Sequence, residues 1–442
     1  MANIAGSDGG APSPSLRRGQ VLMVVLLFAG YAACYFCRAD FAVATPLLID
    51  ELVGRGLTRE EAMVGLGRLA SGGVLAYALG KLCLTGIGDI WGGKRSFLMG
   101  LGGATVFTLL FGAAGILPVF TLAWLGNRLT QSVAWAGLLK VSSRWFDYTA
   151  HGAVVGLLSV SYLVGDALAR GLMGWMLHAG FGWRSLFWMA GGVAGVVFVA
   201  NLMLLRATRA EAGHSEPAVH PDNLYARQAV APVGVGGIVR PLLTSPAFLI
   251  VCGLSLGCTI VRETFNMWTP VYLRDHLGYA MSEAAAFSAV FPGVGAVSVI
   301  VAGWWSDRIG SAGRAVLLCG GLAASTAALL LLTLAPVSAS GSVLALAAIG
   351  LVAFCLLGPY SYLGGALALD FGGRHAGAAA SGLIDGVGYL GAVLAGVTVA
   401  RLAVAFGWRG VFVALAIVCA LSALGAAALL MIHFRRRMPA LR

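Results

Sequence analysis

Phe181-Gly-Trp-Arg-Ser-Leu-Phe187 recurs near the C-terminus as Phe406-Gly-Trp-Arg-Gly-Val-Phe412, at an offset of 225 residues (406 − 181). Phe146 recurs as Phe371 at the same offset. One such match is expected by chance in an apolar chain, whereas two at a single offset are the mark of a duplicated fold. The sequence therefore predicts two homologous halves.

Each half contains apolar segments long enough to cross a bilayer. Of the 442 residues, 59% are hydrophobic and 11% are charged, whereas soluble proteins have roughly a quarter of charged residues. A membrane helix needs roughly 20 apolar residues. Twelve segments meet this requirement: 21–49, 62–86, 95–117, 119–142, 152–177, 185–206, 246–272, 283–306, 313–335, 342–369, 377–402 and 409–433. The sequence predicts an all-α membrane protein with twelve transmembrane helices in two pseudo-symmetric six-helix bundles.

The domain organisation follows from composition. Charged residues, histidines and prolines interrupt the apolar pattern between the halves, as in a surface linker. The predicted units are a polar tail (1–19), an N-terminal domain (20–206), a linker (207–243), a C-terminal domain (244–434) and a basic tail (435–442). The first apolar run is too long for a signal peptide, so no cleaved segment is expected.

Lysines and arginines gather in alternate loops. One side holds most of them, including those of both tails and the linker, and the other side holds few. The excess of positive residues marks the cytoplasmic side. Both termini are therefore predicted to be cytoplasmic, in a multi-pass protein of the inner or plasma membrane.

The same distribution explains the formal charge of +11 by membrane topology. Nucleic acid is therefore not expected as a partner. Eight cysteines are scattered through apolar stretches, which argues against disulfides and a metal site. We expect no cofactor, membrane lipid as the surroundings, and a monomer.

A charged loop motif follows the second helix of each half. The second copy is Gly303-x-x-x-Asp307-Arg308-x-Gly310 with Arg314 after it, and the first is Asp89 with Arg95 after it. The pattern resembles the short-loop signature of the major facilitator superfamily. Such charges at helix ends can form a network that holds the halves together as gating loops. A simple charged turn is the alternative.

Charged side chains also lie within the predicted membrane helices, where each costs ~2.5–3.5 kcal/mol on insertion scales. The cations are Arg38, Lys81, Arg128, Arg170 and Arg262. The carboxylates weighed against them are Asp166, Glu263 and Asp385. The interior is therefore expected to carry about two unbalanced positive charges, which a dianionic ligand would neutralise.

Arg38 and Arg262 occupy nearly equivalent places in the two halves, 224 residues apart (262 − 38). A pseudo-twofold axis is expected to bring them to a central cavity, where guanidinium groups match phosphate oxygens in a bidentate manner. The alternative is that both pair with helix carbonyls or acids and bind no ligand.

Polar residues at helical spacing accompany these cations. Tyr31, Tyr35 and Arg38 share one helix face, Tyr77 and Lys81 share another, and Arg262 and Asn266 share a third. Such stripes predict a wet cavity. Ligand contact and interhelical hydrogen bonding are both open to the tyrosines and to Asn266.

The carboxylates have several open roles. Asp166 and Arg170 are four residues apart and are expected to neutralise each other, with Arg128 as a candidate third member. Glu263 follows Arg262 directly and is expected to point about 100° away from it. Three roles are open to Glu263 and to Asp385: pairing with another helix, holding a proton, or binding a substrate amino group.

Gly30-Tyr-Ala-Ala-Cys-Tyr-Phe-Cys-Arg-Ala-Asp-Phe41 resembles the first helix of the organophosphate:phosphate antiporters. That family includes carriers of glycerol 3-phosphate, hexose phosphates and glucose 6-phosphate, and a sugar-phosphate sensor. Further similar pieces are Ala76-Tyr77-x-x-x-Lys81, Asn127-x-x-x-Gln131-x-x-x-Trp135, Trp268-Thr269-Pro270 and Gly388-Tyr389-Leu390-Gly391. The resemblance covers both halves.

The resemblance implies that Arg38 and Arg262 bind phosphate, that Lys81 supports them, and that Trp135 and Tyr389 belong to the site. Two departures argue against glycerol 3-phosphate as the cargo. Ala39 stands where its carriers have a second basic residue, and Tyr162 stands where they have a histidine.

The function expected from these observations is secondary transport of a small phosphorylated or phosphonate anion, exchanged for inorganic phosphate by a rocker-switch movement of the two halves. No bond is made or broken, so no enzyme is expected. Two alternatives remain: a membrane sensor of sugar phosphate, and a proton-coupled carrier of another organic anion or drug that uses Asp166, Glu263 or Asp385.

Overall fold

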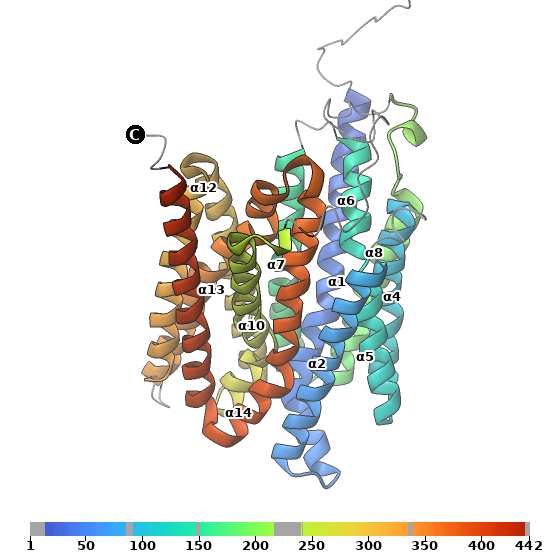
Figure 1. Cartoon of the computed structure of the whole chain (residues 1–442). Coiled ribbons are helices and arrows are strands. Elements are labelled where there is room, and N and C mark those ends of the chain that lie inside the picture. Colours follow the sequence, from blue (N-terminus) through green and yellow to red (C-terminus); the bar gives the residue numbers. More distant parts are fainter. Residues whose placement is uncertain are drawn as a thin grey trace, which may run out of the picture.

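The computed structural model describes residues 14–84, 92–146, 151–215, 240, 242–334 and 339–437. The N-terminal half consists of α1 (Pro14–Gly54), α2 (Arg59–Leu84), α4 (Gly93–Ala113), α5 (Leu117–Gln131), α6 (Ala134–Trp145), α7 (His151–His178) and α8 (Trp183–Leu204). The short turn η2 (Ala210–Ala212) follows. The C-terminal half consists of α10 (Pro246–Asp275), α11 (Met281–Phe287), α12 (Val290–Leu332), α13 (Ala339–Tyr362), the π-helical turn η3 (Leu363–Leu367) and α14 (Ala368–Arg437). In Figure 1, α4, α5 and α8 stand at one edge and α12 and α13 at the other, with α1, α7 and α10 between them.

The prediction of twelve membrane-crossing helices is confirmed. Nine stretches of the described residues are long and apolar enough to span a membrane. One of them, Ala380–Ile432, has 53 residues and would measure ~80 Å as a straight helix, against a hydrocarbon core of ~30 Å. It makes two crossings because the chain reverses direction within α14 (Figure 1), where Gly407 adopts a left-handed φ of +66°. Helix α7 and the pair formed by α5 and α6 supply the last two crossings.

The boundaries of two predicted segments differ in the structure. The segment expected at 119–142 is broken between α5 and α6, at Ser132 and Val133. Ser132 Oγ donates to the carbonyl of Leu129 (2.6 Å) and lies against Gly80 of α2, where a Cβ would come within 2.3 Å of it. The segment expected at 283–306 is divided into α11 and the start of α12. The predicted domain boundaries remain a prediction.

Local sequence signals explain where two helices begin. At α2, Thr58 and Glu61 form a capping box: the Thr58 amide donates to Glu61 Oε2 (2.9 Å) and the Glu61 amide donates to Thr58 Oγ1 (3.2 Å). At α10, Ser245 Oγ accepts from the amide of Phe248 (3.4 Å), and Pro246 follows at the first helical position. Helix α1 bends at Cys37, where ψ is 18°. That bend lies one residue before Arg38.

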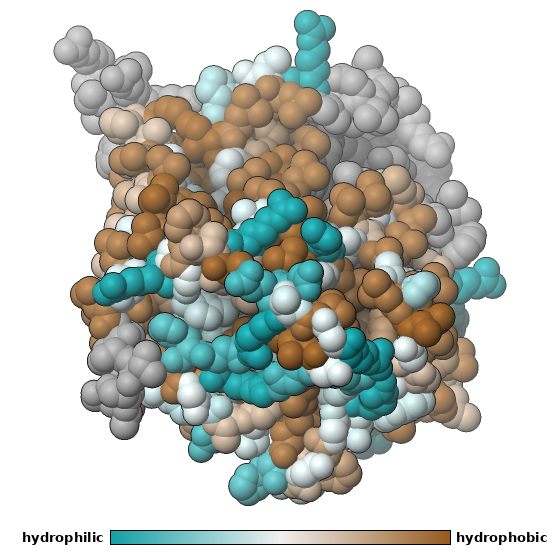
Figure 2. Space-filling view, turned by 90° about the horizontal axis from the view of Figure 1, so that it is seen from below, coloured by the Kyte–Doolittle hydropathy of each residue, from teal (hydrophilic) through white to brown (hydrophobic). Residues whose placement is uncertain are grey.

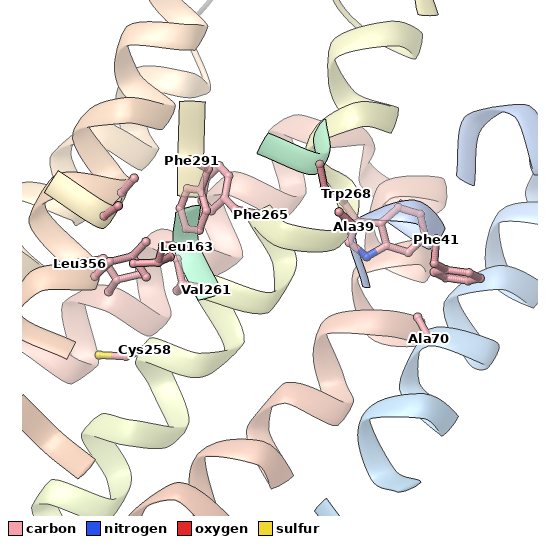
Figure 3. Close-up of a cluster of buried hydrophobic side chains, with 14 of the residues drawn as sticks. Ala39, Phe41, Ala70, Leu163, Cys258, Val261, Phe265, Trp268, Phe291 and Leu356 are labelled. Atoms are coloured by element: carbon pink, nitrogen blue, oxygen red, sulfur yellow. The ribbon is translucent and has the colours of Figure 1, made fainter. Parts of the chain in front are cut away.

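A buried apolar cluster continues from one half to the other. In Figure 3, Phe265 of α10 stacks on Phe291 of α12, with ring centroids 5.0 Å apart. Phe41 of α1 and Trp268 of α10 belong to the same cluster. The repeated motif contributes equivalently in both halves, since Trp183 and Trp408 each pack on the phenylalanine four residues later.

The two halves are tied together at one end of the molecule, which we call the Asp50 face. Arg274 of α10 forms an ion pair with Asp50 of α1 and donates to the carbonyl of Pro46 (2.9 Å). Arg59 of α2 pairs with Asp275 of α10 (2.5 Å) and with Asp50 (3.3 Å). Figure 2, seen from below, shows hydrophilic side chains gathered over the middle of the molecule's lower end. The halves are thus closed against each other at this end.

The predicted gating loops are described only in part. Asp89 lies outside the described residues, and for Asp307 and Arg308 the structure gives the helical path of α12 but no side-chain surroundings. Arg95 is exposed at the start of α4, and Arg314 is half-buried in α12. The charge network of these loops stays a prediction.

Candidate substrate cavity

A cavity lies between the two halves, with about 810 Å³ of empty space when its opening to solvent is included. Helices α1, α2, α5 and α7 line it from the N-terminal half, and α10, α13 and α14 line it from the C-terminal half. The predicted residues that line it are Tyr35, Arg38, Arg128, Asp166, Arg170, Arg262, Glu263 and Asn266. The structure therefore brings one arginine of each half to a shared cavity, as the near-equivalence of Arg38 and Arg262 predicts.

Arg38 is held by neutral groups. Its Nε donates to Gln131 Oε1 (2.5 Å) and its Nη1 donates to the Tyr35 hydroxyl (3.2 Å). The guanidinium carbon lies 4.4 Å from the ring centre of Tyr35 and 4.5 Å from that of Tyr77. Its Nη2 is buried and has no hydrogen-bond partner among the described residues. Arg38 thus keeps a positive charge and an unused donor.

A relay of amides fixes Arg38 from behind. Gln131 Nε2 donates to Asn127 Oδ1 (2.7 Å), and Asn127 Nδ2 donates to Thr108 Oγ1 (2.9 Å). Because each amide is held by the next, the acceptor that faces Arg38 Nε has a fixed orientation. Asn127 and Gln131 appeared in the sequence only as part of the family resemblance, and the structure gives them this positioning role.

Arg262 is paired with its own neighbour. Glu263 Oε1 lies 2.8 Å from Arg262 Nη2 and 3.1 Å from Arg262 Nε. The expectation that Glu263 points away from Arg262 is therefore wrong. Successive residues leave a helix about 100° apart, but both side chains are long enough to bend toward each other. The guanidinium also lies over Tyr360, at 5.0 Å from the ring centre.

Two tyrosines connect the arginines of the two halves. The rings of Tyr77 in α2 and Tyr389 in α14 are 4.9 Å apart. Arg38 lies over Tyr77, and Arg262 lies 5.8 Å from the ring centre of Tyr389. The Lys81 ammonium lies 5.5 Å from the centre of Tyr77 and 5.2 Å from that of Tyr389. With Arg128, which lies 5.3 Å from the centre of Tyr77, cation–π contacts gather four cations around one aromatic pair.

Lys81 and Asp385 form an ion pair across the halves, with Nζ and Oδ2 3.5 Å apart. Of the three roles left open for Asp385, the structure shows pairing with another helix. On the opposite side of Arg38, Tyr31 packs between Tyr35 and Trp135, with ring centroids 5.6 and 5.1 Å away. Tyr31 and Trp135 therefore support Tyr35 from behind, and Tyr35 itself lines the cavity.

Asp166 and Arg170 are paired as expected, with Asp166 Oδ1 3.1 Å from Arg170 Nε. Arg170 also crosses to the other half, where it donates to the carbonyl of Asn266 (2.7 Å) and to Ser288 Oγ (3.1 Å). Arg128 is not a third member of this pair. It lies instead over Tyr77 and Trp124, and its Nε has no hydrogen-bond partner among the described residues.

Replacing Arg170 should strongly destabilise the protein. The side chain is 2% exposed, so Arg170→Met strands the Asp166 carboxylate and two further acceptors, at a cost of about 3–5 kcal/mol for breaking such a buried pair. The expected result is a much lower midpoint of thermal unfolding in detergent. Asp166→Asn, which keeps a polar partner for the guanidinium, should lower the midpoint less. Equal midpoints for Arg170→Met and the unchanged chain would contradict this role.

Asp40 is a buried carboxyl that the sequence analysis did not weigh. It is 0% exposed in the middle of α1, its Oδ1 accepts from the Phe41 amide (2.6 Å), and its Oδ2 has no partner among the described residues. The sequence alone could have indicated this buried carboxyl, because Asp40 follows Arg38 by two residues within an apolar helix. As a carboxylate it lowers the expected excess of buried positive charge from about two to about one.

Comparison with known proteins identifies the family. The Major Facilitator Superfamily profile matches residues 26–396. The chain belongs to this superfamily. Its members are transporters, not enzymes, and the chain is an integral multi-pass membrane protein of that kind.

Three relatives support the resemblance to the organophosphate:phosphate antiporters. The membrane sensor protein UhpC of Escherichia coli strain K12 is 27% identical, over 92% of this chain and 91% of that protein. A probable hexose phosphate transport protein of Chlamydia trachomatis is 26% identical, over 90% and 88%. The glycerol-3-phosphate transporter of Bacillus subtilis is 21% identical, over 94% and 93%. The resemblance to organophosphate:phosphate antiporters is thereby confirmed.

Solved structures agree on the fold. A bacterial homologue of the human lysosomal transporter Spinster superposes with a TM-score of 0.76 at 15% identity, covering 95% of this chain and 98% of the other. A D-xylose–proton symporter gives 0.73 at 14% identity, covering 92% and 97%. The predicted major facilitator fold is confirmed.

Proposed function

We propose that this transporter exchanges a small phosphorylated or phosphonate anion for inorganic phosphate. The observation that carries the proposal is a pair of buried donor atoms without hydrogen-bond partners in the described part of the chain, Arg38 Nη2 and Arg128 Nε, in two arginines that line the cavity. Buried donors without partners are rare in folded proteins, and a ligand that bonds to them removes the cost. Phosphate and phosphonate oxygens suit guanidinium donors in charge and geometry.

The proposed mechanism uses the position of the cavity between the halves. An anion held by Arg38 from one half and Arg262 from the other lowers the cost of bringing these cations together, so the loaded protein can change between its two open states. The distribution of basic loop residues supports an orientation with both termini in the cytoplasm and the Asp50 face outside. In that orientation, the ion pairs of the Asp50 face close the outer side.

Proteoliposomes loaded with labelled phosphate test the proposal. Label is expected to leave when phosphate, hexose 6-phosphate or a phosphonate is added outside, and to stay when glucose or chloride is added, because an empty carrier pays the repulsion of its own cations when it changes state. Liposomes without protein are the control. Label that stays inside with every phosphorylated or phosphonate anion outside would refute exchange.

A sensor is the second candidate, favoured by the 27% identity to UhpC. A sensor would bind a phosphorylated sugar with negligible flux in the same liposomes. A proton-coupled carrier would instead move its cargo in response to a pH gradient alone. These outcomes differ from counterflow, so one preparation separates the three functions.

A further inference from the structure

We propose that the preferred organic cargo is zwitterionic, with an ammonium group a few bonds from its phosphate or phosphonate group, and that Glu263 binds the ammonium. The inference rests on the proposed function, since it names the cargo of the same cavity. It is carried by two features of that cavity: a carboxylate with an unused oxygen, and buried cations with unused donors.

The two oxygens of Glu263 differ in their surroundings. Oε1 accepts from Arg262 Nη2 (2.8 Å), Arg262 Nε (3.1 Å) and Asn266 Nδ2 (3.4 Å). Oε2 accepts no hydrogen bond from any described residue, and Glu263 lines the cavity. One oxygen is thus sufficient to hold Arg262, and the other is available to a ligand that donates hydrogen bonds.

An anionic ligand without an ammonium group fits this arrangement less well than a zwitterion. Glu263 repels negative charge and offsets the positive charge of Arg262, the phosphate partner from the C-terminal half. The repulsion between this carboxylate and a bound anion is strong in a poorly solvated cavity. An ammonium group on the ligand offsets this repulsion, because it places three donors and a positive charge next to Oε2.

The anionic end of the ligand has its own partners in the other half. Arg128 is 5% exposed and lines the cavity with an unused Nε, and Arg38 lines it with an unused, buried Nη2. Neither arginine is hydrogen-bonded to a carboxylate in the described part of the chain. Among the described residues, the cavity therefore has cations without a carboxylate partner on α1 and α5 and a carboxylate oxygen without a hydrogen bond on α10.

Asp166 is less accessible to a ligand than Glu263, since the two side chains are 9% and 17% exposed. Arg170, which holds Asp166 Oδ1, is itself bonded to Asn266 and Ser288 of the other half. Asp385, in turn, is paired with Lys81. Glu263 is thus the cavity carboxylate best placed to select an aminated cargo.

Matched analogues test the inference in liposomes loaded with labelled phosphate. 2-Aminoethylphosphonate and ethylphosphonate differ by the amino group, as do phosphoethanolamine and ethyl phosphate. The aminated member of each pair is expected to give half-maximal efflux at a concentration at least about tenfold lower than that of its amine-free counterpart. This is the effect of one charge-assisted hydrogen bond. Equal potency within both pairs would overturn the inference.

Glu263→Gln assigns the preference to its residue. The ratio of the two half-maximal concentrations is compared within each protein, so a general loss of activity cancels. In Glu263→Gln the ratio is expected to fall to about twofold or less, and in Glu263→Asp, which keeps the charge, it should remain above that of Glu263→Gln. A full preference retained by Glu263→Gln would overturn the role of Glu263.

Two further measurements keep the outcomes separate. Phosphate-for-phosphate exchange by the unchanged chain tests the proposed function alone, because it involves no amine. If that exchange occurs without an amine preference, the proposed function stands and this inference fails. Glu263→Gln could prove inactive in liposomes. In that case, the concentration of each analogue that gives half-maximal thermal stabilisation is measured on the detergent-solubilised protein, and the ratio within each pair of analogues is compared in the same way.

Discussion

Arg38→Lys should abolish exchange even though it keeps the positive charge. The guanidinium makes hydrogen bonds to Gln131 and Tyr35 and lies between the rings of Tyr35 and Tyr77, with Nη2 left for the ligand. An ammonium group is a compact charge that cannot stack in this way and offer a bidentate pair of donors at the same time. Loss of two charge-assisted hydrogen bonds to the ligand corresponds to about 100-fold or more in the rate of phosphate exchange.

Phosphate counterflow in liposomes measures this effect. Arg401→Lys is the matched control, because Arg401 is an exposed arginine of α14 and the same substitution there should leave exchange unchanged. Arg262→Lys should also lose exchange, since the lysine cannot both hold Glu263 and reach the ligand. Full activity of Arg38→Lys, in protein that reaches the liposomes at normal yield, would remove Arg38 from the site.

The architecture was largely predictable from the sequence, because membrane helices depend on long apolar runs and duplication leaves matches at a fixed offset. The prediction erred at particular backbone positions. Nothing in the apolar pattern of 119–142 signals the break at Ser132, since hydroxyls that bond back to a carbonyl also occur within unbroken helices, as at Thr45 and Thr259.

The site was predictable at the level of helix faces and less so at the level of contacts. The near-equivalence of Arg38 and Arg262 in the two repeats predicted that they share a cavity, helical spacing put Asn266 on the same face as Arg262, and all three line the cavity. It failed for Glu263, because the direction in which a residue leaves the helix does not fix where a long side chain ends. It also could not show that Arg170 bonds to Asn266 and Ser288, since contacts between the halves depend on how the halves are packed.

Removing the ion pairs of the Asp50 face should open the cavity on that side. Arg274 and Arg59 of the two halves share Asp50, and Arg59 also binds Asp275, so the network connects α1 and α2 with α10. Each exposed pair contributes only ~0–1 kcal/mol, but Arg274–Asp50 and Arg59–Asp275 both join the halves and break when the halves separate at this end. Arg59→Gln combined with Arg274→Gln should therefore shift the balance of states by about 1–2 kcal/mol, or about 5–30-fold.

A cysteine at Ala42, which lines the cavity, reports this shift through its labelling by a membrane-impermeant thiol reagent applied from the Asp50 face. Labelling should rise in the double variant and phosphate exchange should slow, because the state closed at this face becomes less populated. The chain without Ala42→Cys gives the background from native cysteines. Arg55→Gln is a matched control: Arg55 and Arg59 side chains are both 49% exposed, but Arg55, in the turn that follows α1, pairs with Glu51 of α1 in the same half. Because that pair does not cross the halves, Arg55→Gln should leave labelling unchanged, and an equal rise in both proteins would show that loss of surface charge, not separation of the halves, is responsible.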